Sequence, residues 1–258
     1  MKSPRFSQQV ERLNVQVFNT RAEMGQSAAA DAAQHLRQLL AGQGSVRIIF
    51  AAAPSQNEFL AHLANAEGID WARVEAFHMD EYVGLPENSD ALFSHYLTQH
   101  LFDKVKPGVV YRIPATGDPQ PLCEMYSNLL QRAPIDMVCL GIGENGHLAF
   151  NDPPVADFND PEVMKVVELD AVCRQQQVND GCFPSLDNVP THALTLTIPT
   201  LMAAHRLFCM VPGKNKQQAI TQTLTLPLSV ACPATILRSH PACTLYTDVA
   251  GFGELTHA

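Results

Sequence analysis

The sequence predicts a doubly wound, Rossmann-like α/β fold, in which helices cover both faces of a mostly parallel sheet. Short apolar runs rich in β-branched residues alternate with amphipathic stretches along most of the chain, as expected when strands alternate with covering helices. The run 135–140 is apolar at nearly every position, which suits a central strand buried on both faces. With 258 residues and no internal repeat or linker, we expect a single domain over 1–258.

Each element has its own local signal. The Ala-rich segment 21–40 has helical apolar spacing and is followed by Gly42 and Gly44, which predicts a helix that ends there. Ser89 is the expected N-cap of a helix over 90–105. The predicted strands are 14–18, 46–51, 74–78, 109–113, 135–140, 164–169, 193–198, 206–211 and 244–247, and the other predicted helices are 57–66, 121–132 and 215–224. Between 144 and 190 regular signals are otherwise sparse, as in functional or mobile segments.

Composition argues against a nucleic-acid-binding protein and against a membrane or secreted protein. The 17 basic and 26 acidic side chains give a formal net charge of −9, which argues against a nucleic-acid partner because such proteins need a basic surface. The chain has no apolar run long enough to span a membrane and no apolar stretch of a secretory signal near its first residues. Its seven cysteines form no C-x-x-C pair, as expected for reduced thiols. We therefore expect a soluble, cytoplasmic protein.

Chemically distinctive residues follow four of the predicted strands. In a doubly wound sheet, ligands bind at the carboxyl ends of the strands, so these segments are expected to meet at one edge. They are the segment 52–55, the pair Asp80 and Glu81, the segment GIGENGHLAFND over 141–152, and the turn 213–216.

Asp80 and Glu81 form an acid pair directly after a predicted strand. Neighbouring carboxylates at a partly desolvated edge repel each other, so the more buried one should have a raised pKa and could act as a general base. The alternative is a solvated turn that Asp80 caps.

The segment over 141–152 is the most specific signal. Its glycines, Gly146 among them, allow close approach of the backbone to a ligand or a positive φ. His147 lies between Asn145 and Asp152 and can transfer protons near neutral pH. In the alternative interpretation, His147 only satisfies a backbone carbonyl within a turn.

Lys214 and Lys216 precede a predicted helix, where they could bind an anion or simply be solvated. The histidines show no metal-ligand spacing, and the chain lacks the glycine-rich motifs of dinucleotide and P-loop sites as well as the G-x-S-x-G motif of serine hydrolases. We therefore expect no metal, and dinucleotide, P-loop and serine-hydrolase sites lose their main support.

The segments MDEYVGLP from Met79 and LGIGENGHLAFNDP from Leu140 resemble the two signature segments of the glucosamine-6-phosphate deaminase (isomerase) family. The similarity continues through ALTLTIPTLMAAHRL from Ala193, the 213–216 turn and CPATILRSHP from Cys232, and so covers most of the chain. The related 6-phosphogluconolactonases typically have an Arg where this chain has Tyr82. The resemblance implies the deaminase/isomerase fold and a small amino-sugar phosphate as substrate, without a cofactor and with a possible homo-oligomer.

Residue by residue, the resemblance implies that Asp80 moves a proton between C2 and C1 of the opened sugar. It implies that His147 opens the pyranose ring, oriented by Asn145 and Asp152, and that Lys216 binds the phosphate. Ser55, Glu81, Gly146 and Lys214 complete the predicted substrate-binding set.

The chain departs from the family pattern around the phosphate. The segment AAAPSQ over 51–56 replaces a Gly- and Thr-rich loop and keeps only the hydroxyl of Ser55, and Cys182 stands where the family has an arginine. Lys214 is the nearest candidate to restore the missing charge. These departures leave two alternative functions open, namely a 6-phosphogluconolactonase-like hydrolase in which His147 activates water, and a non-catalytic sugar sensor.

Overall fold

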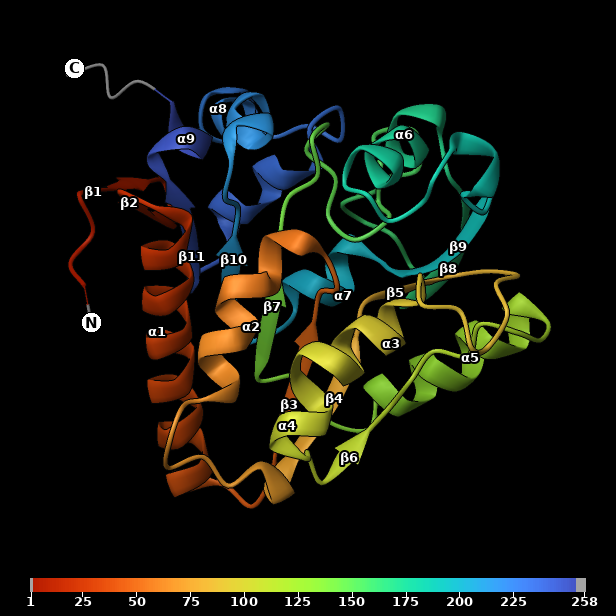
Figure 1. Cartoon of the computed structure of the whole chain (residues 1–258), viewed down its shortest axis with the longest axis horizontal. Helices are drawn as coiled ribbons and strands as arrows, with labels where there is room; N and C mark the ends of the chain where they lie inside the picture. Colours follow the sequence, from red (N-terminus) through yellow and green to blue (C-terminus); the bar gives the residue numbers. More distant parts are fainter. Residues whose placement is uncertain (1, 254–258) are drawn as a thin grey trace.

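The centre of the computed structural model, which describes residues 2–253, is an eight-stranded sheet (Figure 1). Its strands are β1 (Phe6–Val10), β2 (Leu13–Phe18), β3 (Val46–Phe50), β4 (Val74–His78), β6 (Val109–Val110), β7 (Met137–Leu140), β10 (Arg206–Met210) and β11 (Cys243–Asp248). They lie in the order β1-β2-β11-β10-β7-β3-β4-β6, and only β1 and β2 pair antiparallel. The predicted mostly parallel sheet is confirmed.

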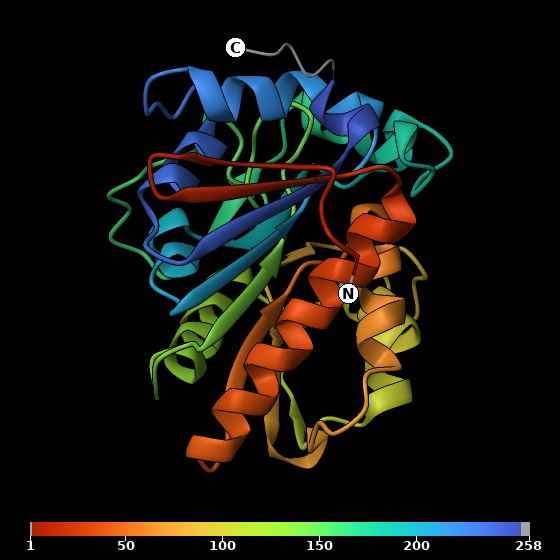
Figure 2. The same cartoon turned by 90° about the vertical axis from the view of Figure 1, so that its left-hand side faces the viewer.

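Helices cover both faces of this sheet. One face carries α1 (Arg21–Gly42), α2 (Asn57–Ala64), α3 (Phe93–Leu97), the π-helical turn Thr98–Phe102 and α4 (Asp103–Val105). The other carries α5 (Pro119–Leu130), α7 (Ile198–Met202), α8 (Gln217–Thr225) and α9 (Val249–Phe252). Figure 2 shows α1 and α5 on opposite sides of the strands. The doubly wound arrangement is therefore confirmed.

The two helical layers explain why the central strands are apolar at consecutive positions. Side chains alternate between the two faces of a strand. In β3, Ile48 and Phe50 pack into the core beneath α1 and α2, whereas Ile49 packs into the core on the side of α5. A strand covered on both faces must be apolar on both, so its sequence pattern is a short continuous run.

A second, smaller sheet lies beside the first and is antiparallel. It consists of β5 (Asp80–Tyr82), β9 (His192–Leu196) and β8 (Met164–Glu168), in that order. Two of these strands were predicted from the sequence, but the separate sheet was not. Between β8 and β9 lies α6 (Ala171–Asn179), a helix in the segment where regular signals are sparse; the side chain of Asp170 caps its first turn.

The predicted N-cap at Ser89 is wrong. Helix α3 begins at Phe93, and its first amides donate hydrogen bonds to the carboxylate of Glu81. The Ser89 hydroxyl instead accepts a hydrogen bond from the amide of Ala91. A side chain from another part of the chain therefore replaces the local cap, which local sequence cannot indicate. Within residues 2–253, no helix has the length and apolar character needed to span a membrane.

Candidate active site

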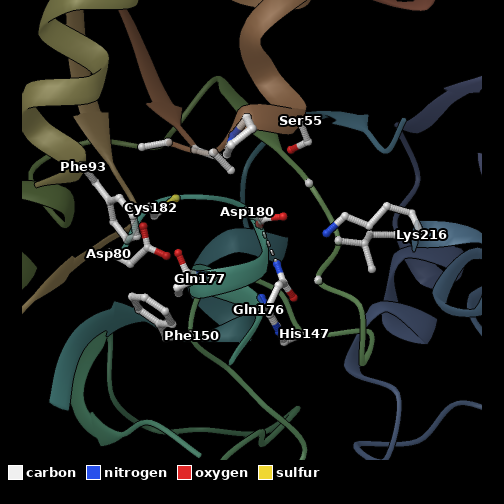
Figure 3. A pocket seen from close by; sticks show the side chains of 18 of the residues that line it. Ser55, Asp80, Phe93, His147, Phe150, Gln176, Gln177, Asp180, Cys182 and Lys216 are labelled. Carbon is white, nitrogen blue, oxygen red and sulfur yellow. Dashed lines mark hydrogen bonds between the residues drawn. The ribbon is translucent and has the colours of Figure 1, made fainter. Parts of the chain in front are cut away.

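A pocket opens at the carboxyl ends of four strands that are neighbours in the sheet, β10, β7, β3 and β4 (Figure 3). From β3 the chain proceeds outward to β4 and β6, and it then returns to β7 on the other side of β3. Loops diverge at such a topological switch point, and ligands of open α/β sheets bind there. All four loops that the sequence singled out contribute to the lining, which includes Ser55, Asp80, Gly141, Gly143, His147 and Lys216.

Asp80 is the acid of the predicted pair that faces the pocket. Figure 3 shows its carboxylate between the rings of Phe93 and Phe150, and the side chain is only 8% exposed. Burial, together with the neighbouring carboxylate of Glu81, raises the pKa of Asp80 well above its usual value. A carboxylate in this setting is a stronger base than one in water, although Asp80 is not the more buried acid that the sequence predicted to be the base.

Glu81 supports the fold and does not line the pocket. Its prediction as a substrate-binding residue is therefore wrong. Side chains alternate along β5, so Glu81 points away from the pocket and is fully buried. Its carboxylate accepts hydrogen bonds from the amides of Tyr82, Phe93 and Ser94 at 3.2, 3.0 and 3.0 Å. The more buried acid of the pair therefore holds the N-terminus of α3, and the less buried one faces the ligand site.

Glu81 is expected to make the folded protein less stable as the pH rises from about 4.5 to about 7. Burial raises the pKa of Glu81 to about 7, so in this range the folded protein retains a proton that the unfolded chain has lost. The difference in pKa corresponds to about 3 kcal/mol. Urea unfolding of wild type and Glu81→Gln between pH 4 and 8 should show the variant gaining relative stability as the pH rises. A difference in unfolding free energy that is constant with pH would contradict this expectation.

His147 is held by a hydrogen-bonded network with the two residues predicted to orient it. Its Nδ1 lies 2.7 Å from Oδ1 of Asn145 and 3.1 Å from Oδ1 of Asp152. The amide of Asn145 also donates to Oδ1 of Asp152 at 2.9 Å. Because both contacts of Nδ1 are to oxygen acceptors, we assign the proton to Nδ1. Nε2 is then the ring atom left to accept a proton from a ligand.

Asp152 is ionised by this network although it is buried. Burial favours the neutral acid, but the hydrogen bonds and charge of His147, with the amide of Asn145, lower the pKa of Asp152 below its usual value. An ionised Asp152 stabilises the positive charge that His147 acquires when it takes a proton. The three residues can therefore act as one acid–base unit.

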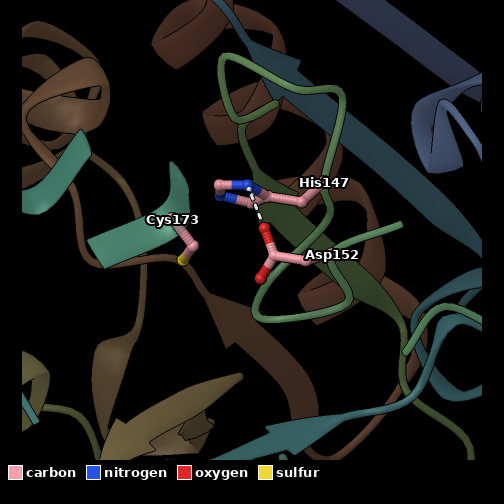
Figure 4. A group of neighbouring side chains, drawn as sticks. All are labelled: His147, Asp152 and Cys173. Carbon is pink, nitrogen blue, oxygen red and sulfur yellow. Dashed lines mark ion pairs between the residues drawn. The ribbon is translucent and has the colours of Figure 1, made fainter. Parts of the chain in front are cut away.

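The thiol of Cys173, from α6, lies next to this unit (Figure 4). Ligand atoms of His147, Asp152 and Cys173 lie within 4.8 Å of one another, which is compatible with a metal site. However, Nδ1 of His147 and Oδ1 of Asp152 already bind each other. Burial also raises the pKa of Cys173, so it is a thiol and not the thiolate that binds metals. The geometry fits a hydrogen-bonded network better than a metal centre.

Gly146 shapes the loop and does not line the pocket, which corrects its prediction as a substrate-binding residue. Its φ is +83°, and a Cβ at this position would lie 2.6 Å from Sγ of Cys232. Gly143 is the glycine that makes room for the His147 side chain, since a Cβ there would lie 2.0 Å from its ring. Both positions require glycine for steric reasons.

Of the two predicted lysines, only Lys216 reaches the pocket. Lys216 lines it and is 7% exposed, whereas Lys214 is exposed and lies outside the lining. Both belong to the 3₁₀ turn Lys214–Lys216, in which residues two apart in sequence point in different directions. Lys214 therefore does not replace the positive charge of the family arginine at the position of Cys182. Ser55 lines the pocket as predicted, and its hydroxyl accepts a hydrogen bond from Nε2 of the Gln56 side chain at 3.1 Å.

The pocket also contains residues that the sequence interpretation missed. Arg21, the first residue of α1, reaches it from the first helix, and Phe93 reaches it from α3. The α6 region contributes Gln176, Gln177 and Asp180, together with Cys182, which the sequence analysis had already singled out. The sequence analysis did not predict α6, although Asp170, which caps its first turn, is a local signal that could have located the start of the helix. Arg21 had no local signal, because its role depends on where α1 packs.

Comparison with known proteins gives a consistent set of relatives. Residues 19–246 match the family described as glucosamine-6-phosphate isomerases/6-phosphogluconolactonase. The chain is 36% identical over 182 residues to the glucosamine-6-phosphate deaminase of Bacillus thuringiensis (strain Al Hakam), an alignment that covers 70% of this chain and 67% of that protein. The enzyme of the same name from Bacillus anthracis (strain A0248) is equally similar over the same length.

Solved structures resemble the whole fold. A monomeric glucosamine-6-phosphate deaminase of the NagB superfamily superposes with a TM-score of 0.84 at 26% identity, covering 92% of this chain and 98% of that chain. The 6-phosphogluconolactonase of Thermotoga maritima superposes with a TM-score of 0.75 at 19% identity, covering 92% and 99%. The second similarity concerns the fold alone.

Proposed function

We propose that this chain, which belongs to the family of glucosamine-6-phosphate isomerases and 6-phosphogluconolactonases, is an isomerising deaminase of an amino-sugar phosphate. The net reaction converts a hexosamine 6-phosphate and water to a ketose 6-phosphate and ammonia. The observation that carries the proposal is one pocket holding a desolvated carboxylate, Asp80, and a separate acid–base unit centred on His147. An aldose–ketose isomerisation requires both groups, because ring opening and proton transfer between carbons involve different atoms of the sugar.

His147 acts first on the closed sugar. Its Nε2 accepts the proton of the hydroxyl on C1, and the imidazolium then returns a proton to the ring oxygen as the C1–O5 bond breaks. Asn145 and ionised Asp152 keep the ring in place and stabilise its charge through Nδ1. The product of this step is the open-chain aldehyde.

Asp80 acts on the open chain. Its carboxylate removes the proton from C2, next to the carbonyl, while the carbonyl oxygen on C1 takes a proton from the ammonium group on C2, which gives an enolamine. Asp80 then returns its proton to C1, so that C1 carries a hydroxyl and C2 becomes the iminium carbon. Water then adds to C2, and ammonia leaves as the ketose phosphate forms. Phe93 and Phe150, which flank Asp80, exclude water from the carboxylate and so maintain its basicity.

The lactonase alternative is supported by the shared fold, and in it His147 would activate water for attack on a lactone. The alternative of a non-catalytic sugar sensor requires only that the pocket bind a sugar. Association into a homo-oligomer stays a prediction from the family resemblance.

Ammonia release tests the proposal. The full chain is incubated with glucosamine 6-phosphate, galactosamine 6-phosphate and the two unphosphorylated amino sugars, and ammonia is followed by a coupled dehydrogenase assay. We expect release from at least one phosphorylated amino sugar. Hydrolysis of 6-phosphogluconolactone without ammonia release would favour the lactonase. Thermal stabilisation by these ligands without any turnover would favour a binding protein.

A further inference from the structure

The pocket contains an ammonium group that has no hydrogen-bond partner among the described residues. Lys216 is 7% exposed, and among residues 2–253 its Nζ has no hydrogen bond or ion pair. Burial lowers the pKa of Lys216, while the carboxylates of Asp180 and Glu144 favour its charged form. Figure 3 shows the amino group directed into the pocket. The side chain is mostly buried while its amino group is accessible from the pocket and has no protein partner, so this end of the pocket is suited to an anionic group of a ligand.

Arg21 supplies a second cation at the same end. Its Nε donates a hydrogen bond to Glu58 at 2.7 Å, and one terminal nitrogen donates to the carbonyl oxygen of Pro54. These bonds hold the guanidinium against the loop after β3, beside Ser55, and Arg21 lines the pocket together with Ser55 and Lys216. The other terminal nitrogen, Nη1, has no partner within the described part of the chain. The charge of Arg21 also lowers the pKa of Lys216, which reflects their proximity.

We propose that Arg21 binds the phosphate of the substrate together with Lys216, and that it thereby selects phosphorylated over unphosphorylated amino sugars. This inference rests on the proposed function, and it assigns the preference for phosphorylated substrates to Arg21, a residue of the first helix. A guanidinium presents several N–H donors in one plane and matches a phosphate better than a single ammonium does. The hydroxyl of Ser55 provides a neutral donor beside it.

Acidic residues limit where the phosphate can lie. Asp180 lines the same pocket, and its carboxylate accepts a hydrogen bond from Gln176 at 3.4 Å. A phosphate next to Asp180 would be repelled, so we expect it on the side of Arg21 and Ser55. Glu58 is bound to Nε of Arg21, which keeps the guanidinium in place before the ligand arrives.

The test is Arg21→Gln in the full chain. Loss of one charge-assisted contact should raise KM for glucosamine 6-phosphate by about 10- to 100-fold, with kcat changed by less than about threefold. Affinity for inorganic phosphate, measured by calorimetry, should fall by a similar factor. Selectivity for phosphorylated over unphosphorylated glucosamine should fall with it. Arg21→Lys keeps the charge without the planar donors and should lie between wild type and Arg21→Gln.

Two matched variants separate phosphate binding by Arg21 from a general effect of changing α1 or its ion pair. Glu58→Gln breaks the same ion pair but keeps the guanidinium, and its KM should rise much less than that of Arg21→Gln. Arg37, also on α1, binds the carbonyl oxygen of Glu67 outside the pocket, and Arg37→Gln should leave KM unchanged. An unchanged phosphate affinity in Arg21→Gln, or an equal loss in Glu58→Gln, would overturn the inference. If no amino-sugar phosphate is turned over, the proposed function fails, and phosphate calorimetry still decides the role of Arg21.

Discussion

Replacing Asp80 with asparagine is expected to lower kcat by about 10²- to 10⁴-fold, the usual contribution of general acid–base catalysis. Asparagine preserves the shape of the side chain between Phe93 and Phe150 but cannot accept a proton from C2. The fold and KM should therefore change little, which circular dichroism and calorimetric titration can verify. A variant with near-normal turnover on the best substrate would exclude Asp80 as the base.

The pH dependence of kcat provides a second test of Asp80. Burial and Glu81 raise the pKa of Asp80, so activity should decline on the acid side at a higher pH than an ordinary aspartate would cause. Glu81 ionises only near pH 7, so the negative charge that Glu81→Gln removes is present only above that pH. The variant should therefore move the part of the acid limb that lies above pH 7 to lower pH, and a limb unchanged there would show that a different group titrates.

Replacing His147 with glutamine is expected to slow the closed-ring substrate by about 10²-fold or more, because glutamine can neither take nor return a proton. The effect should be far smaller on a 5-deoxy analogue, which lacks the ring oxygen and cannot close to a pyranose. Steady-state kinetics of both compounds with wild type and variant measure this difference. Equal losses on the two compounds would place His147 in a later step or assign it only a structural role in the loop.

The orientation of His147 can be tested separately. Asp152→Asn keeps an oxygen near Nδ1 but removes the charge that stabilises the imidazolium. We expect a smaller loss than in His147→Gln, confined again to the closed-ring substrate. This comparison distinguishes the proton-transferring group from the residue that supports it.

The sequence by itself determined the parallel sheet and the segments that surround the pocket. Strands such as β3 and β7 are covered on both faces and must be apolar at consecutive positions, so a local pattern locates them. In a doubly wound sheet the residues that follow such strands lie at its ligand-binding edge. Asp80, His147 and Lys216 could therefore be selected without coordinates.

Only the tertiary structure decided which residue of each sequence pair, Asp80 or Glu81 and Lys214 or Lys216, faces the pocket. Pairing of β5 with β9 directs Asp80 into the pocket and Glu81 toward the start of α3, although the two acids are adjacent in sequence. The 3₁₀ turn likewise separates Lys216 from Lys214.

Local sequence patterns also could not predict the pocket residues that come from α1 and the α6 region, because their places depend on tertiary packing. Arg21 reaches the pocket because α1 packs beside α2, where Glu58 and Pro54 hold its guanidinium. The α6 region contains a short polar helix whose own sequence gives weak periodicity. Local sequence specifies which face of an element is apolar, whereas its neighbours in space are set by packing of segments far apart in the chain. The segments that follow the strands and line the pocket were thus predictable from sequence, and which of their side chains face the pocket was decided by the tertiary structure.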